Sequence, residues 1–207
     1  MKLIMFDMDG TLVDSSNAIT NTINYVRENI GFERLEKDFI LEKVNDPKIN
    51  AAEFFYGTKE FTDEQVVLFE EYYNEHCLLD LEVYDGISKL IEDLKSDFTL
   101  AVATNASSQF ARKMLDHVGL EKHFSSILGF DSVKNPKPHP EMVHKILNNH
   151  NILNHNAQLI GDSHKDIMAA TKAQEDSVLV NWGFSNHEKD AIHTVEELEQ
   201  KIIEKFK

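Results

Sequence analysis

Acidic side chains that could do covalent or metal chemistry follow the first apolar run of the 207-residue chain. Asp7 and Asp9 are separated by one residue and are followed by Gly10. Two carboxylates this close repel each other unless a cation or a shared proton relieves them. They can also divide the work of catalysis, one as a nucleophile and the other as a proton carrier. A turn that caps a helix uses the same residue types, so that interpretation stays open.

A second pair of acids follows the apolar run 157–160. Asp162 and Asp166 are four residues apart, and both can point toward the same end of a sheet if a helix begins near Ser163. Carboxylate oxygens suit Mg²⁺, which usually takes one or two of them and keeps several waters. The alternative is that Asp162 caps the helix and Asp166 lies on the surface.

Two further segments carry groups that can hold phosphate oxygens. Thr104 and Asn105 follow the apolar run 98–103 and offer a hydroxyl, an amide and the N–H groups of a helix start. Lys137 stands between two prolines, which stiffen its backbone, and could neutralise phosphoryl charge or balance Asp7. A helix cap at Asn105 and an exposed lysine in a turn are the alternatives. Together with the acids, these groups are what phosphoryl transfer needs.

Alternating strand and helix patterns place these segments at one edge of a sheet. Short apolar runs of the kind found in strands buried on both faces occur at residues 2–6, 98–103, 126–128, 157–160 and 177–180. Amphipathic helical repeats lie between them. The alternation from residue 82 onward predicts a Rossmann-like α/β fold, a parallel sheet with helices on both faces. In such sheets ligands bind beyond the carboxyl ends of the strands.

Residues 15–81 break this alternation, because only helical patterns appear there. One amphipathic helix ends at Gly31, and a second long helix begins after Thr62. We therefore predict an inserted α-helical cap of residues 15–81, within a catalytic core formed by residues 1–14 and 82–207.

Composition limits the partners that the chain can have. The formal net charge is −15, and such a field repels nucleic acid and anionic membranes. The single cysteine, Cys77, fits a reducing compartment. The N-terminus lacks a secretory apolar region, and no stretch approaches the ~20 apolar residues of a membrane span. We expect a cytoplasmic protein that binds neither nucleic acid nor membrane, and the pattern leaves monomer or dimer open.

In order and spacing, the four segments resemble the motifs of the haloacid dehalogenase superfamily, in its phosphoglycolate-phosphatase-like branch with a helical cap. Residues 7–15, Asp-Met-Asp-Gly-Thr-Leu-Val-Asp-Ser, match the first motif. Thr104 and Asn105 match the second motif, Lys137 matches the third, and residues 161–166 match the fourth.

The resemblance implies a role for each residue. Asp7 would attack phosphorus and form an aspartyl-phosphate, and Asp9 would protonate the leaving group and then activate water. Thr104, Asn105 and Lys137 would bind the phosphoryl group.

The resemblance also implies a magnesium site. Mg²⁺ would be held by the Asp7 side chain, the Asp9 backbone carbonyl and Asp162, with Asp166 supporting these ligands from behind.

The carboxylate at Asp9 narrows the reaction implied by the resemblance. It favours phosphate ester chemistry over dehalogenation or ATP-driven transport. We expect Mg²⁺-dependent hydrolysis of a small phosphorylated metabolite. The alternatives are a sugar phosphomutase similar to β-phosphoglucomutase, a pyrophosphatase of the same superfamily, and a non-catalytic binding protein.

Overall fold

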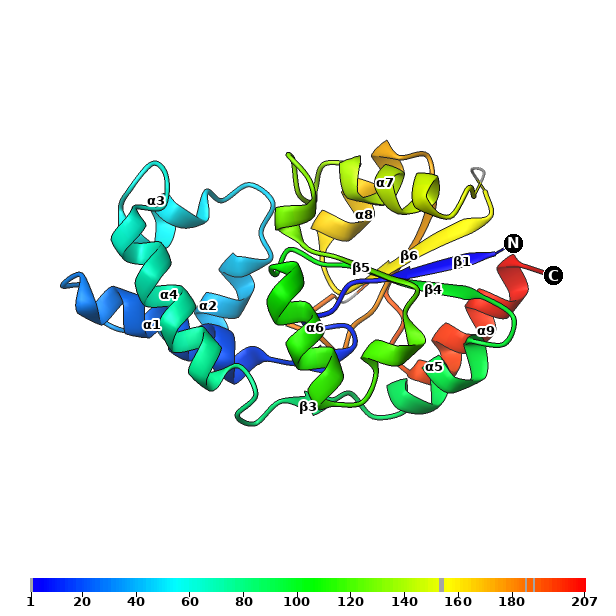
Figure 1. Ribbon diagram of the computed structural model, residues 1–207, viewed down its shortest axis with the longest axis horizontal. Helices are drawn as coiled ribbons and strands as arrows, with labels where there is room; N and C mark the ends of the chain where they lie inside the picture. The colour runs from blue at the N-terminus through cyan, green and yellow to red at the C-terminus, as the bar shows by residue number, and fades with distance from the viewer. Residues whose placement is uncertain (1, 153–154, 185, 188) are drawn as a thin grey trace.

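The centre of the computed structural model is a five-stranded sheet in the order β5-β4-β1-β6-β7 (Figure 1). The structure describes residues 2–152, 155–184, 186–187 and 189–207. Each pair of neighbouring strands in this sheet runs parallel. The strands are β1 (Leu3–Phe6), β4 (Thr99–Ala103), β5 (Ser126–Leu128), β6 (Ala157–Gly161) and β7 (Asp176–Leu179). The predicted parallel α/β sheet is confirmed, and each strand lies within one residue of its predicted run.

Side chains of β1 alternate between two buried layers. Ile4 and Phe6 belong to one apolar cluster, and Leu3 and Met5 belong to another. Helices α5 (Ile87–Leu94), α6 (Ser108–His117) and α9 (Val195–Lys205) contribute to the first cluster. Helices α7 (Glu141–Asn149) and α8 (His164–Lys172) contribute to the second, on the opposite face (Figure 1). Because β1 is covered on both faces, its carboxyl end is held rigidly where Asp7 begins.

A separate group of helices lies beyond the carboxyl ends of the strands (Figure 1). They are α1 (Ser16–Asn29), α2 (Lys37–Val44), α3 (Ala51–Tyr56) and α4 (Asp63–His76). The group, which we call the helical unit, has its own apolar cluster, centred on Val26, Ile40 and Phe55. An inserted helical unit was predicted. Its treatment as a domain of residues 15–81 stays a prediction.

Two short strands at the junctions of the helical unit were not predicted. β2 (Val13–Asp14) pairs antiparallel with β3 (Glu82–Val83), so Val13 faces Val83 and Asp14 faces Glu82. A two-residue strand carries no readable alternation, so its pairing depends on contacts that the local pattern does not contain. The pair joins the two ends of the helical unit directly beside the turn that follows β1.

Short 3₁₀ turns complete the connections of the core, η1 (Glu121–His123) before β5 and η2 (Phe130–Ser132) after it. Within the part of the chain that the structure describes, none of the helices is long and apolar enough to cross a membrane.

Candidate active site

The turn after β1 presents Asp7 at the carboxyl edge of the sheet. The Asp7 amide donates to the Ile160 carbonyl at 2.8 Å, which continues the strand ladder by one residue. The Met8 amide then donates to Asp7 Oδ1 at 2.7 Å. Gly10 completes the turn with φ of +78°, and a Cβ atom there would stand 2.3 Å from Asp162 Oδ2. The turn therefore requires glycine, both for its backbone angle and for its contact with Asp162.

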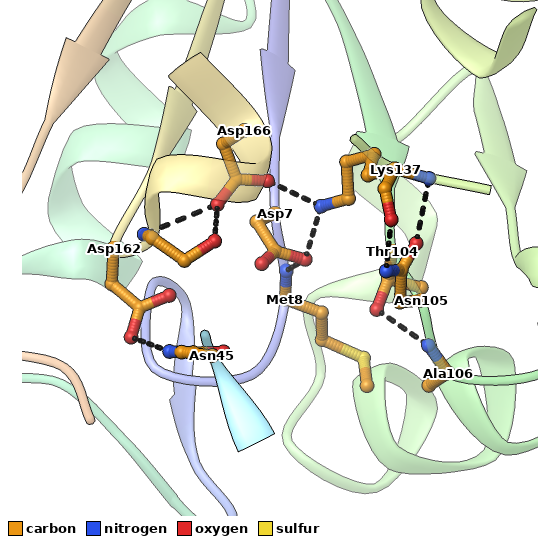
Figure 2. Close-up of polar contacts among 10 residues, drawn as sticks. Asp7, Met8, Asn45, Thr104, Asn105, Ala106, Lys137, Asp162 and Asp166 are labelled. Carbon is orange, nitrogen blue, oxygen red and sulfur yellow. Dashed lines mark hydrogen bonds and ion pairs between the residues drawn. The ribbon is translucent and has the colours of Figure 1, made fainter. Parts of the chain in front are cut away.

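Lys137 joins two carboxylates at the centre of the site (Figure 2). Its Nζ lies 2.9 Å from Asp7 Oδ1 and 2.5 Å from Asp166 Oδ1. Burial alone would lower the pKa of Lys137, but the carboxylates of Asp166 and Asp7 outweigh it and hold this pKa above its ordinary value. Burial raises the pKa of Asp7 to about 7, against the opposing effect of Lys137. The ammonium is thus fixed in its charged form.

Both carboxylate oxygens of Asp166 contact neighbouring residues. Its Oδ1 contacts Lys137, and its Oδ2 accepts from the Ser163 amide at 3.2 Å and the Ser163 hydroxyl at 2.6 Å. Ser163 is the N-cap of α8, and the Asp166 carboxylate completes its capping box. With both oxygens engaged, Asp166 is suited to the supporting role that the sequence analysis gave it.

Asp162 keeps one carboxylate oxygen without a partner. Its Oδ2 accepts from Asn45 Nδ2 at 3.1 Å and from the Phe184 amide at 2.8 Å. Its Oδ1 is buried and has no hydrogen-bond partner among the described residues. Figure 2 shows this oxygen facing Asp7. Burial raises the pKa of Asp162 well above its ordinary value, and the charges of Asp7 and Asp166 add to that effect.

This geometry fits a hard divalent cation. Asp7, Asp162 and Asp166 each offer an oxygen, and these oxygens lie within 4.8 Å of one another. Three carboxylates against the one ammonium of Lys137 would leave an excess of two negative charges. The unpartnered Oδ1 of Asp162 needs a cation or a proton, and Mg²⁺ prefers such oxygen ligands.

Asp9 is placed to hold and release a proton. Its Oδ1 accepts a hydrogen bond from the Ser15 hydroxyl, at the start of the helical unit. Burial raises the pKa of Asp9, against that hydrogen bond and the charge of Lys137. A carboxyl group of raised pKa keeps its proton nearer to neutral pH, as a general acid must.

Thr104 and Asn105 stand at the end of β4, but they face different partners. Thr104 is buried, and its Oγ1 accepts from the Ala106 amide at 3.1 Å. The Asn105 side chain contacts the Lys137 backbone, where Nδ2 donates to the Lys137 carbonyl at 2.8 Å and Oδ1 accepts from its amide at 3.1 Å. In this arrangement Asn105 positions Lys137. Phosphate binding by Asn105 stays a prediction.

The structure also brings in residues that the sequence analysis did not select. Asn45 reaches Asp162 from the helical unit across 117 residues of sequence. Gly183, which follows β7, also lies against Asp162. A Cβ atom at this position would stand 2.2 Å from the Gly10 carbonyl oxygen and 2.5 Å from Asp162 Oδ2. Asn45 belongs to no strand-end pattern, so local sequence carried no signal for it. Gly183 lies three residues after the predicted strand 177–180, so its place at the strand end could have indicated it.

Comparison with known proteins agrees with this geometry. The family model for haloacid dehalogenase-like hydrolases matches residues 4–180. A phosphoglycolate phosphatase of Aquifex aeolicus is 31% identical over 185 residues, which cover 89% of this chain and 86% of that protein. One from Colwellia psychrerythraea is 27% identical, with the same coverage of both chains. The crystal structure of a predicted phosphatase from Clostridium acetobutylicum superposes with a TM-score of 0.86 at 26% identity, and the alignment covers 98% of each chain.

Proposed function

The chain belongs to the haloacid dehalogenase-like hydrolase family, and from this premise we propose that it is a metal-dependent phosphatase with Asp7 as its covalent nucleophile. The family and the phosphoglycolate phosphatase relatives identify a phosphatase. The metal, the nucleophile, the residue roles and the substrate are the parts that we propose.

One observation carries the proposal. The Lys137 ammonium contacts Asp7, while the unpartnered oxygen of Asp162 faces Asp7 from the other side (Figure 2). A carboxylate nucleophile that approaches a phosphate dianion is repelled unless nearby positive charge neutralises the phosphoryl oxygens. Lys137 supplies one such charge, and the acidic edge is suited to hold Mg²⁺ as a second. We propose the Asp7 side chain, the Asp9 carbonyl and Asp162 as its ligands.

In the first step a carboxylate oxygen of Asp7 attacks phosphorus, and the bond from phosphorus to the ester oxygen breaks. Asp9 gives its proton to the departing alkoxide, so the alcohol leaves neutral. Thr104 and Lys137 donate hydrogen bonds to the phosphoryl oxygens during the transfer. The product on the enzyme is an aspartyl-phosphate at Asp7.

In the second step Asp9, now a carboxylate, takes a proton from a water molecule as that water attacks phosphorus. The bond from phosphorus to Asp7 breaks, inorganic phosphate is released, and the Asp7 carboxylate is restored. Asp9 ends the cycle protonated, as it began. A bound divalent cation supplies charge neutralisation at the phosphoryl oxygens and aligns the nucleophile.

Phosphoglycolate is the first substrate that we propose, because the relatives from Aquifex and Colwellia carry that activity in their names. The acidic surface is unsuited to nucleic acid, so a small phosphorylated metabolite is the proposed partner. A cytoplasmic location is part of this proposal.

The test measures hydrolysis of phosphoglycolate and of an aryl phosphate with Mg²⁺ or EDTA. Wild type should release phosphate only with the metal. Asp7→Asn should lower kcat by about 10³-fold or more, because the nucleophile is lost. Asp116→Asn, at an exposed position on α6, is the matched control and should behave as wild type. Mg²⁺-dependent hydrolysis that survives in Asp7→Asn would exclude the nucleophile.

Product analysis separates the alternative reaction. With a hexose 1-phosphate, free phosphate supports the phosphatase, whereas an isomeric hexose phosphate would indicate a phosphomutase. An enzyme that turns over none of a broad panel of phosphate esters would contradict both.

A further inference from the structure

The loop after α2 carries a side chain into the candidate metal site. Asn45 Nδ2 donates to Asp162 Oδ2 at 3.1 Å (Figure 2). The Phe184 amide donates to the same oxygen at 2.8 Å. Phe184 belongs to the core, but Asn45 belongs to the helical unit. The orientation of one buried carboxylate is therefore fixed jointly by two parts of the protein that lie far apart in sequence.

A second contact joins the same two surfaces. Lys165 Nζ, on the first turn of α8, donates to the Val44 carbonyl at 2.6 Å. Val44 is the last residue of α2, so its carbonyl is one that the helix leaves without an internal partner. The partial negative charge of a helix C-terminus favours a cation there. Adjacent residues of the helical unit, Val44 and Asn45, thus dock on the segment that begins with Asp162.

We propose that Asn45 is a positioning residue for the metal ligand Asp162, and that docking of the helical unit and metal binding are coupled through it. This inference rests on the proposed function, because it assigns a divalent cation to the Asp162 site. Asn45 holds Oδ2 so that Oδ1 keeps facing Asp7. Because coupling between two binding events is reciprocal, the bound metal should also favour the docked helical unit.

The expected loss of Mg²⁺ affinity in an Asn45 variant follows from the two hydrogen bonds that Asp162 Oδ2 accepts. Residues that orient metal ligands typically change metal affinity by about 10- to 100-fold when they are removed. The Phe184 amide would still hold the Asp162 carboxylate in an Asn45 variant. We therefore expect the low end of this range, about tenfold weaker Mg²⁺ binding.

The first measurement is calorimetric titration of Mg²⁺ into the full chain without substrate. Asn45→Ala and Asn45→Leu both remove the donor, and the leucine variant keeps the side-chain bulk. Both should show an Mg²⁺ Kd about tenfold above wild type. Lys48→Ala, at an exposed position on the same loop, is the matched control and should bind as wild type.

The second measurement is hydrogen exchange over residues 40–50, with and without Mg²⁺. In wild type the metal should lower deuterium uptake in this segment. In Asn45→Ala this protection should be lost, because the metal no longer acts on the loop. A residue with a purely structural role would change the melting temperature of the metal-free protein and leave the Mg²⁺ response of the loop intact.

The inference is overturned if folded Asn45→Ala and Asn45→Leu bind Mg²⁺ within twofold of wild type, or if wild type itself does not bind Mg²⁺. Its failure is distinguishable from failure of the proposed function. If the Asn45 variants bind Mg²⁺ as tightly as wild type, and wild type hydrolyses phosphate esters, only the coupling is refuted. Weaker binding in the variants supports the coupling, and hydrolysis by wild type then decides the function separately.

Discussion

The ammonium of Lys137 lies 2.5 Å from Asp166 Oδ1, and the two side chains are 2% and 0% exposed. The contact ties the loop before α7 to the start of α8, on which Asp166 also completes the helix cap. A buried pair of this kind contributes little beyond a well-packed apolar pair, but removing one partner leaves an uncompensated charge. The pair therefore makes the site intolerant of single substitutions.

Lys137→Met should lower the free energy of unfolding by about 3–5 kcal/mol, because Asp7 and Asp166 then lose their common cation. Lys134→Met, at an exposed position on the same loop, should change it by less than about 0.5 kcal/mol. Adding Asp166→Asn to Lys137→Met should recover part of the loss, since one unpaired carboxylate is removed. Urea unfolding of the variants measures these differences. A Lys137→Met protein as stable as Lys134→Met would show that the ion pair does not contribute to the free energy of unfolding.

Metal-free protein should lose stability as the pH rises through the titration of Asp7. The pKa of Asp7 is 3.8 in the unfolded chain and about 7 in the folded protein, so the folded state binds more protons between these values. The free energy of unfolding therefore falls as the pH rises from about 4 to about 7. Asp7→Asn lacks this group, so in EDTA the stability of wild type relative to the variant should decline across that window.

Excess Mg²⁺ should oppose this decline, because the metal binds deprotonated carboxylates. The increase in melting temperature that Mg²⁺ produces should be larger at pH 7.5 than at pH 5.5, and it should shrink in Asp162→Asn. A metal-induced increase that is the same at both pH values would show that these carboxylates are not the ligands.

Asn105→Ala should impair catalysis through Lys137. The variant loses the two hydrogen bonds that hold the Lys137 backbone, at 2.8 and 3.1 Å, which contribute about 1–2 kcal/mol together. We expect a lower kcat with KM near wild type, since the ammonium is misplaced while the substrate pocket remains. Gln109→Ala, exposed on α6, is the control. A change confined to KM would instead favour direct phosphate binding by Asn105.

Gly183→Ala should weaken Mg²⁺ binding, because the added methyl group would press on the Gly10 carbonyl and on Asp162. Overpacking of this kind costs about 1–3 kcal/mol of stability. Gly31→Ala is an informative control, since Gly31 has a positive φ but open space around it. It should lose stability and keep wild-type Mg²⁺ affinity. Equal Mg²⁺ affinity in both variants would contradict the steric argument.

Elements with strong local patterns could be predicted from the sequence. The buried strand β1 shows as an uninterrupted apolar run, and Thr62 marks the start of α4 with a complete capping box. The pair β2–β3 could not be found in this way, because its two-residue strands are defined by each other across about 70 residues of chain.

The residues of the candidate site likewise fall into two groups, those that local sequence could predict and those that depend on tertiary contacts. Asp7, Lys137 and Asp162 stand at strand ends or between prolines, where residue type and position already suggest chemistry. The role of Asn105 as a support for Lys137 and the reach of Asn45 to Asp162 depend on which loops meet in space. Strand-end patterns predict the edge of a sheet, but they do not predict which side chain crosses from a separate unit to meet it.

Pairing of β2 with β3 makes the helical unit, in topological terms, an oversized hairpin loop. Asp14 and Glu82 face each other in an antiparallel ladder, so the chain leaves the core and returns to it at one point. Opposed residues in such a ladder are about 5 Å apart, a gap that a two-residue turn can span. Loops of very different length can close on such a base, because closure entropy grows only slowly with length. Evolution can therefore replace the helical unit while leaving β1, the strand that precedes Asp7, unchanged.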